Sequence, residues 1–287
     1  MNLWKKVALG LFGIIVFMAF TLFHYMEGVG DLRTKYAKTK GPSVAAQKKG
    51  RILLQECISA MGGVEHWKRI KKQTIKITFQ HDWDSFFLRT FFMPLEFSGQ
   101  RLSLLLKPGE ASAHLTFLTG KWKNKRWGIH KKKTYEKLPD GTLIVKPNKT
   151  ITFNVLSYRF FFFLPFYLSE AKLVTYAGTR KLHGSHYNLI YITWGKWTPQ
   201  RNVDQYLLWI NQKTKRVDFV QSTVRDKFAR SITTATLRNY QTVLGVKLPF
   251  SIKILQDIRV VDNGMHHMKL MKVEPMKNGT FPMTGTI

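Results

Sequence analysis

The stretch CISAMGGVEHWKRIKKQTI, from Cys57 to Ile75, contains the point at which the chain changes from helix to strand. Apolar residues recur at helical spacing between Val44 and Met61, and Gly62-Gly63 end that predicted helix. Residues 64–70 predict one or two further helical turns. From Gln73 onward, apolar and polar residues alternate as they do in a strand with one buried face. The stretch therefore predicts short helices followed by a β-rich remainder.

The rest of the chain is a succession of candidate strands separated by turn signals. Five strands are predicted in the second half: Tyr187–Trp194, Tyr206–Ile210, Val217–Val224, Ile232–Tyr240 and Val246–Leu255. Turns are predicted at Lys107-Pro108-Gly109, Pro139-Asp140-Gly141, His183-Gly184-Ser185 and Asp262-Asn263-Gly264. Neither a βαβ alternation nor an internal repeat is evident. The predicted fold class is mainly β with helices (α+β): one strongly curved antiparallel sheet or unclosed β-barrel.

The segment SYRFFFFLPFYLSE, Ser157 to Glu170, belongs to a predicted helical or irregular insertion at residues 148–168. Its nine most apolar residues, Phe160–Leu168, are too few to cross a bilayer, which needs about 20. Four consecutive phenylalanines cannot all face one way in a helix or a strand, and Pro165 favours a bend. The segment is either core or the wall of an apolar site. We expect these rings at the rim of the sheet, some packed inward and some lining a pocket mouth.

The N-terminus carries a candidate membrane segment. Lys5-Lys6 precede Val7–Phe23, which has no charged residue, and 17 residues at ~1.5 Å each span about 26 Å, slightly less than a ~30 Å hydrocarbon core. The next residues offer poor signal-peptidase sites. We therefore expect an uncleaved anchor (or, alternatively, a signal sequence) at residues 1–26, a basic tether at 27–43 and a folded domain at 44–287.

The charges around this segment bear on its orientation. Lys5-Lys6 favour a cytoplasmic N-terminus, whereas the basic residues that follow within about twenty positions favour the reverse under the positive-inside rule. A short basic head before an apolar run is the usual export signal. The expected location is thus the inner membrane, single-pass, with the C-terminal domain in the periplasm.

The charge balance is strongly basic. Lys and Arg number 46 against 17 Asp and Glu, a formal net charge of +29, which attracts nucleic acid or the anionic headgroups of a membrane, unless it reflects a general lysine bias. The segment GKWKNKRWGIHKKKTYEK, Gly120 to Lys137, mixes lysines with Trp122, Trp127 and Tyr135, as a nucleic-acid surface does. A strand pair with apolar residues inward and lysines outward gives the same pattern. Nucleic-acid binding is therefore only an alternative.

Residues with catalytic or metal-binding chemistry do not form a convincing centre. His183 and His186 flank a hairpin tip, His266-His267 would point to opposite faces of a strand, and Asp82 and Asp84 share one face near a strand end. Neither a phosphate-binding loop nor a nucleophile elbow is present. The single Cys57 excludes an internal disulfide and is expected to be a small buried residue. We predict no enzyme, no metal and no cofactor.

Three patterns in order resemble the outer-membrane lipoprotein-sorting (LolA-like) superfamily. They are CISAMGGVEHWKRIKKQTI, then YRFFFFLPFYLSE with YAGTRKLHGSHYNLIYITW and QYLLWINQKTKRVDFVQSTV, and finally NYQTVLGVKLPFSIKI. The resemblance covers roughly Lys48 to Val273. It implies an unclosed antiparallel barrel whose concave apolar face is lidded by helices and holds acyl chains. The basic charge and the retained membrane segment depart from a soluble periplasmic carrier.

The predicted function is that of a membrane-anchored periplasmic protein that binds a lipid or acyl-chain ligand, in lipid or lipoprotein transport or envelope maintenance. The predicted cavity residues are aromatic or leucine: Phe160, Phe161, Phe162, Phe163, Leu164, Phe166, Trp122 and Trp127. The expected partners are the acylated ligand and anionic headgroups. An accessory subunit that grips a partner protein in an envelope membrane complex is the alternative, and a basic nucleic-acid-binding protein is the third hypothesis.

Overall fold

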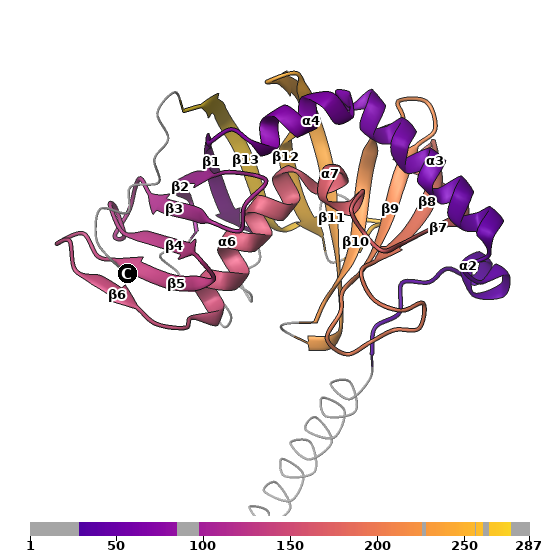
Figure 1. Ribbon diagram of the computed structural model, residues 1–287, viewed down its shortest axis with the longest axis horizontal. Coiled ribbons are helices and arrows are strands. Elements are labelled where there is room, and N and C mark those ends of the chain that lie inside the picture. Colours follow the sequence, from indigo (N-terminus) through magenta and orange to yellow (C-terminus); the bar gives the residue numbers. More distant parts are fainter. Residues whose placement is uncertain (1–28, 85–97, 226–227, 256, 261–263, 277–287) are drawn as a thin grey trace, which may run out of the picture.

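The computed structural model describes residues 29–84, 98–225, 228–255, 257–260 and 264–276 (Figure 1). Its helices are α2 (Lys35–Lys40), α3 (Val44–Ala60), α4 (Gly63–Lys71), α6 (Lys149–Phe162) and α7 (Leu164–Leu168). None of the helices in these ranges is both long and apolar enough to cross a bilayer. The predicted anchor, residues 1–26, lies outside the described residues.

The strands form a single antiparallel sheet. They are β1 (Ile75–Trp83), β2 (Gln100–Leu106), β3 (Ala113–Phe117), β4 (Arg126–His130), β5 (Lys133–Lys137), β6 (Leu143–Val145), β7 (Leu173–Leu182), β8 (Ser185–Thr193), β9 (Gln205–Asn211), β10 (Val217–Val224), β11 (Phe228–Val243), β12 (Val246–Leu255) and β13 (Gly264–Pro275). Their order is β6-β5-β4-β3-β2-β1-β13-β12-β11-β10-β9-β8-β7. The chain builds the sheet outward from β1 to β6, passes through α6 and α7, and returns from β7 to β13. The last strand pairs with the first, β6 and β7 stay as edges, and the sheet is not closed, as predicted.

The helices α3, α4, α6 and α7 pack on one face of the sheet, called here the helix face. Helix α6 contacts β3, β4 and β5 and also β12, although three strands separate β12 from β3 in the sheet order. The sheet must therefore bend around α6 (Figure 1). Helix α3 crosses β7 closely at Gly50, where an added Cβ would lie 2.7 Å from the backbone nitrogen of Tyr176. A larger residue at Gly50 would push the helix away.

The opposite face of β7–β10 carries a second apolar cluster. Its sheet residues are Ala177, Tyr187, Leu189, Tyr191, Leu207, Trp209 and Phe219. Leu32 and Ala37 cover them from residues 29–40, a segment called here the strap. The described part of the predicted basic tether is thus packed against the sheet, which differs from the expectation. Its exposed lysines give the segment the composition of a solvated linker, but Leu32 and Ala37 pack on the cluster and hydrogen bonds to the sheet hold the segment in place.

Most predicted elements are present. The strands Val217–Val224 and Val246–Leu255 have the predicted ends, and the other three predicted in the second half are longer or shifted by one to four residues. The insertion at residues 148–168 is helical, as α6 and α7. Helix α3 begins at Val44 behind Ser43, whose hydroxyl accepts a hydrogen bond from the Ala46 amide.

Candidate functional site

Helices α6 and α7, residues 149–168, form a lid over the helix face. Asn148 caps α6 by accepting a hydrogen bond from the Ile151 amide at 3.1 Å. The buried residues of α6 follow a helical stripe: Ile151, Asn154, Val155, Tyr158 and Phe162. Helix α6 ends at Phe162 with Phe163 as its C-cap, and Pro165 lies in the first turn of α7, where its missing amide hydrogen costs nothing. The sequence thus folds the lid as two helices with a bend between them.

The four phenylalanines have two environments. Phe162 and Phe163 are fully buried, whereas Phe160 and Phe161 are only partly buried. The ring of Phe162 lies 5.1 Å from that of Phe79 on β1. Leu164 and Phe166 are also fully buried, and Phe166 stacks on Trp67 of α4 at 4.7 Å. Four of the predicted cavity residues therefore pack the lid onto the sheet and onto α4.

A second group of rings lies at the margin of the lid. Phe160 lies 5.1 Å from Tyr206 on β9 and is stacked with Tyr167 of α7 at 6.4 Å. Tyr206 in turn meets Trp194, which follows β8, at 5.8 Å. We call Phe160, Phe161, Tyr167, Tyr206 and Trp194 the aromatic rim. All but Trp194 are half-buried, and Trp194 is exposed.

Trp122 and Trp127 belong to a different group, around Phe117 on β3. Each indole lies 5.1 Å from the Phe117 ring, and the Lys125 ammonium lies 4.5 Å from the Trp122 ring. Trp127 is buried and donates a hydrogen bond from Nε1 to Glu136 at 2.9 Å. Strands β4 and β5 thus form the strand pair considered above. Trp127 and Tyr135 are buried within it, so neither offers a ring face for stacking a base.

A polar chain that the sequence did not reveal lies under the lid. The Tyr158 hydroxyl of α6 is 2.6 Å from Nδ1 of His81, and Nε2 of His81 is 2.9 Å from Nδ1 of His266. Burial holds the pKa of His81 well below its usual range and lowers the pKa of His266 to about 3, with neighbouring His267 adding repulsion. Both rings are therefore neutral near pH 7, and each can donate one hydrogen bond and accept one. In the structure His81 lies on the same face of β1 as the buried Ile77 and Phe79, and its partner on β13 is distant in sequence.

Two further hydrogen bonds of the lid go to one carbonyl. Arg159 Nη2 and the Tyr167 hydroxyl donate to the Pro108 carbonyl at 2.9 and 2.8 Å. At the end of α7, Glu170 forms an ion pair with Lys71 of α4. Apart from these ties, the lid contacts described above are between apolar and aromatic side chains.

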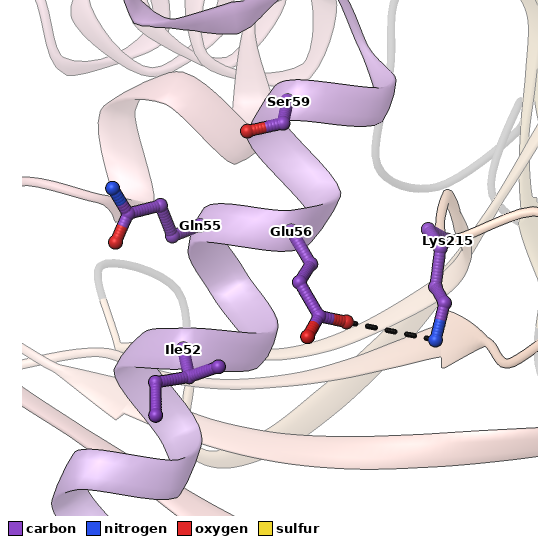
Figure 2. Close-up of a pocket in the computed structure, with 5 residues that line it drawn as sticks. All are labelled: Ile52, Gln55, Glu56, Ser59 and Lys215. Atoms are coloured by element: carbon purple, nitrogen blue, oxygen red, sulfur yellow. Dashed lines mark ion pairs between the residues drawn. The ribbon is translucent and has the colours of Figure 1, made fainter.

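Among the described residues, two hollows lie beside the helices α3 and α4. The larger, about 630 Å³, lies beside α3 and is lined by Ile52, Gln55, Glu56, Ser59 and Lys215; Figure 2 shows Glu56 and Lys215 reaching toward each other, 3.5 Å apart. The smaller, about 260 Å³, is lined by His66, Arg69, Ile70, Gln73, Leu244 and Gly245. Neither contains a predicted cavity residue. Beneath the lid the helix face carries the buried side chains of the main apolar cluster, so a ligand that enters there would have to displace some of them.

The other candidate residues lie in ordinary structural positions. His266 faces His81 while His267 contacts Ser251, so the pair does point to opposite faces. His183 contacts the Ile258 carbonyl, and Asp82 forms an ion pair with Lys269. Cys57 is fully buried, as predicted, and burial raises the pKa of its thiol to about 12. In the described ranges, no three His, Cys, Asp or Glu residues are grouped as metal ligands.

Comparison with solved structures shows the fold. A domain from Vibrio parahaemolyticus described as an outer membrane lipoprotein-sorting protein has a TM-score of 0.51 and 12% identity over 82% of this chain and 95% of its own. A DUF1329 family protein from Desulfovibrio piger has a TM-score of 0.50 and 8% identity over 82% and 95%. A LolA superfamily protein from Nitrosomonas europaea covers 80% and 94% at 9% identity, with a TM-score of 0.46. No protein-family model and no curated protein matches the chain. The fold is LolA-like, as the sequence resemblance predicted.

Proposed function

We propose that the chain is a membrane-anchored envelope protein that binds the acyl chain of a lipid or lipid-modified ligand on the helix face. The observation that carries this proposal is the chemistry of the lid. Helices α6 and α7 cover the face mainly through rings and aliphatic side chains, with few hydrogen bonds to the rest of the domain. Removing such a lid exposes an apolar surface that an acyl chain can cover in its place.

The energetics favour this exchange. Apolar burial is non-directional and contributes roughly 25 cal/mol per Å², so a methylene chain can replace ring contacts without matching their geometry. Phe160 and Phe161 are half-buried at the margin of the lid. Their exposed sides can cover an entering chain while their buried sides stay packed against the core. Each ring that a bound chain shields would contribute about 1–2 kcal/mol of affinity.

The proposal also covers where the protein lies in the envelope and what it does with its ligand. Residues 7–23 would hold the protein in the inner membrane, the domain would be periplasmic, and no chemistry would be performed on the ligand. Alkaline phosphatase fused to the C-terminus should be active in a Gram-negative host, and carbonate washing should leave the full-length chain in the membrane fraction. An inactive fusion would reverse the orientation. A soluble chain that begins near Val29 would show that the apolar segment is a cleaved signal sequence.

Ligand binding is tested with a fluorescent fatty acid and the full-length protein in mild detergent. Phe160→Ala should weaken binding about tenfold, which corresponds to ~1.4 kcal/mol, while the melting temperature changes little. Tyr36→Ala removes a partly exposed ring of the strap that packs beside Tyr176 on the edge strand β7, and is the matched control. Equal binding by all three proteins, or no saturable binding by the unsubstituted chain, would contradict an acyl site under the lid.

Mass spectrometry of what co-purifies with the protein complements this assay. Lipid supports the proposal. A stoichiometric protein in place of lipid would instead support the accessory-subunit hypothesis, and nucleic acid would support the third.

A further inference from the structure

The strap is fixed at one end of strands β8–β10. Arg225, just after β10, donates from Nη2 to the Gly30 carbonyl at 2.6 Å. Gln205, the first residue of β9, accepts a hydrogen bond from the Leu32 amide at 2.9 Å. Thr34 donates its hydroxyl proton to the Ala177 carbonyl at 2.6 Å. These directional contacts set the position at which the chain enters the domain.

This entry point is close to the uncharged segment in sequence. From Phe23 to Gly30 there are seven residues, which reach at most about 25 Å when fully extended. If residues 7–23 lie in a bilayer, as the proposed function holds, this end of β8–β10 lies within that distance of the membrane. The other end of these strands is separated from this end by the length of the strands, about 23 Å for the seven residues of β9.

The loop between β8 and β9, residues 194–204, lies at the same end. Trp194 is 41% exposed, Lys196 and Arg201 are exposed, and Trp197 is half-buried. The loop is braced by hydrogen bonds from the Lys196 amide to Gln200 Oε1 at 2.7 Å and from the Gly195 amide to Thr193 Oγ1 at 3.1 Å. It presents its rings and charges from a fixed backbone.

The loop and the strap contact each other. The Arg33 guanidinium lies 5.3 Å from the Trp197 ring. Asp31 beside it is engaged by Arg33 at 3.0 Å and Lys38 at 3.1 Å. Asp204 accepts hydrogen bonds from the Arg225 amide and the Thr223 hydroxyl. Of the described residues at this end, Asp31 and Asp204 are therefore held by internal partners, while Lys196 and Arg201 are exposed.

We infer that the 194–204 loop contacts the headgroup region of an anionic bilayer. Tryptophan with lysine or arginine is the side-chain combination that collects at membrane interfaces, and each basic residue near an anionic surface adds about 1 kcal/mol. Trp194 also touches Tyr206, which touches Phe160. The contact surface therefore continues into the aromatic rim, so an acyl chain leaving the bilayer meets the lid without crossing open water.

The test compares two lysines at opposite ends of β9. Lys196→Cys places a cysteine in the loop, and Lys213→Cys places one in the exposed β9–β10 turn. Each full-length variant is labelled with a bimane dye and reconstituted into vesicles that contain phosphatidylglycerol and a lipid with a nitroxide near its headgroup. Cys57 is fully buried, and the unsubstituted chain measures any label it takes up.

We expect quenching at residue 196 to be at least about threefold greater than at residue 213, because some 23 Å of strand separates the two positions. Equal quenching at both positions, or stronger quenching at 213, would overturn the inference. Release of the protein from the vesicles by carbonate washing would also overturn the inference, because a released chain has no membrane anchor. Fatty-acid binding measured on the same samples reports the proposed function separately: a preference for 196 without acyl binding leaves the bilayer contact standing and removes the acyl site.

Discussion

The two faces of the sheet are covered in different ways. On the helix face, α6 and α7 rest on β1 and α4 through Phe162, Phe163 and Phe166, with a few polar ties. On the other face, the strap is short and is held by hydrogen bonds to Ala177, Gln205 and Arg225. One cover depends on apolar area and the other on directional contacts.

The two kinds of cover suit two different tasks: exchange of a bound partner and maintenance of a fixed position. Apolar contacts tolerate a change of partner, because another apolar group of similar area restores most of the free energy. Hydrogen bonds to fixed backbone groups do not, since an unmatched buried donor costs about 1–3 kcal/mol. A domain that binds an acyl chain while keeping its orientation to a membrane needs both kinds of cover. The predictions below test whether the two faces behave in these two ways.

The largest effect is expected at Phe162. Replacing this fully buried ring with alanine should lower the free energy of unfolding by about 3–5 kcal/mol, because it removes contacts with Phe79 and Tyr158 and leaves a cavity. Phe160→Ala is the matched control, half-buried on the same helix, and should cost about 1 kcal/mol or less. Urea unfolding measures both. Similar losses at the two positions would mean that the rim is core.

The second-largest effect is expected from acid, which should lower the free energy of unfolding through the buried histidines of the helix face. The folded pKa of His266, about 3, is below the unfolded value of about 6.5, so the unfolded chain binds more protons between these limits. The stability from this group is complete above pH 6.5 and decreases by up to ~1.4 kcal/mol per pH unit as the pH falls toward 3. Buried His81, whose pKa is also lowered, adds in the same direction.

The loss between pH 7 and pH 5 that His266 causes should therefore reach about 2 kcal/mol. His266→Gln should flatten this dependence, measured as the urea midpoint at the two pH values. His186→Gln, at an exposed hairpin position, is the control for removing one histidine from a strongly basic chain. A slope that His266→Gln does not alter would assign the acid sensitivity to other groups.

The β architecture was predictable because its signals are local. Alternation in β1, the turn signals and the Gly62-Gly63 corner each act within a few residues, and the sheet follows from a series of hairpins. Two features depend on distant pairing and were missed. His81 meets His266, 185 positions later, and Leu32 bonds Gln205, 173 positions later. Which of the four phenylalanines are buried depends on how α6 and α7 pack on the sheet, and the local sequence does not fix that packing.

The strap should respond to loss of a single acceptor. Gln205→Met keeps the side-chain length but leaves the Leu32 amide without its partner, which should cost about 1–2 kcal/mol locally. Amide exchange at Leu32 should then accelerate roughly tenfold, since 1.4 kcal/mol is a factor of ten. The control is Gln212→Met in the β9–β10 turn, which removes a hydrogen bond to Asn188 on β8. Fatty-acid binding should not change in either variant, because the Gln205 side chain points to the strap and Gln212 lies at the other end of β9.

The smallest effect on stability is expected at Trp194. Its ring is 41% exposed and meets Tyr206 at the surface, so Trp194→Ala should change the free energy of unfolding by only about 0.5 kcal/mol. Transfer of a fluorescent fatty acid from anionic vesicles to the protein should nevertheless slow severalfold, while affinity at equilibrium stays the same, because the ring contacts the bilayer and not the bound chain. Trp209→Phe, in the cluster beneath the strap, should leave the transfer rate unchanged. A loss of affinity without a change in rate would instead place Trp194 in the ligand site.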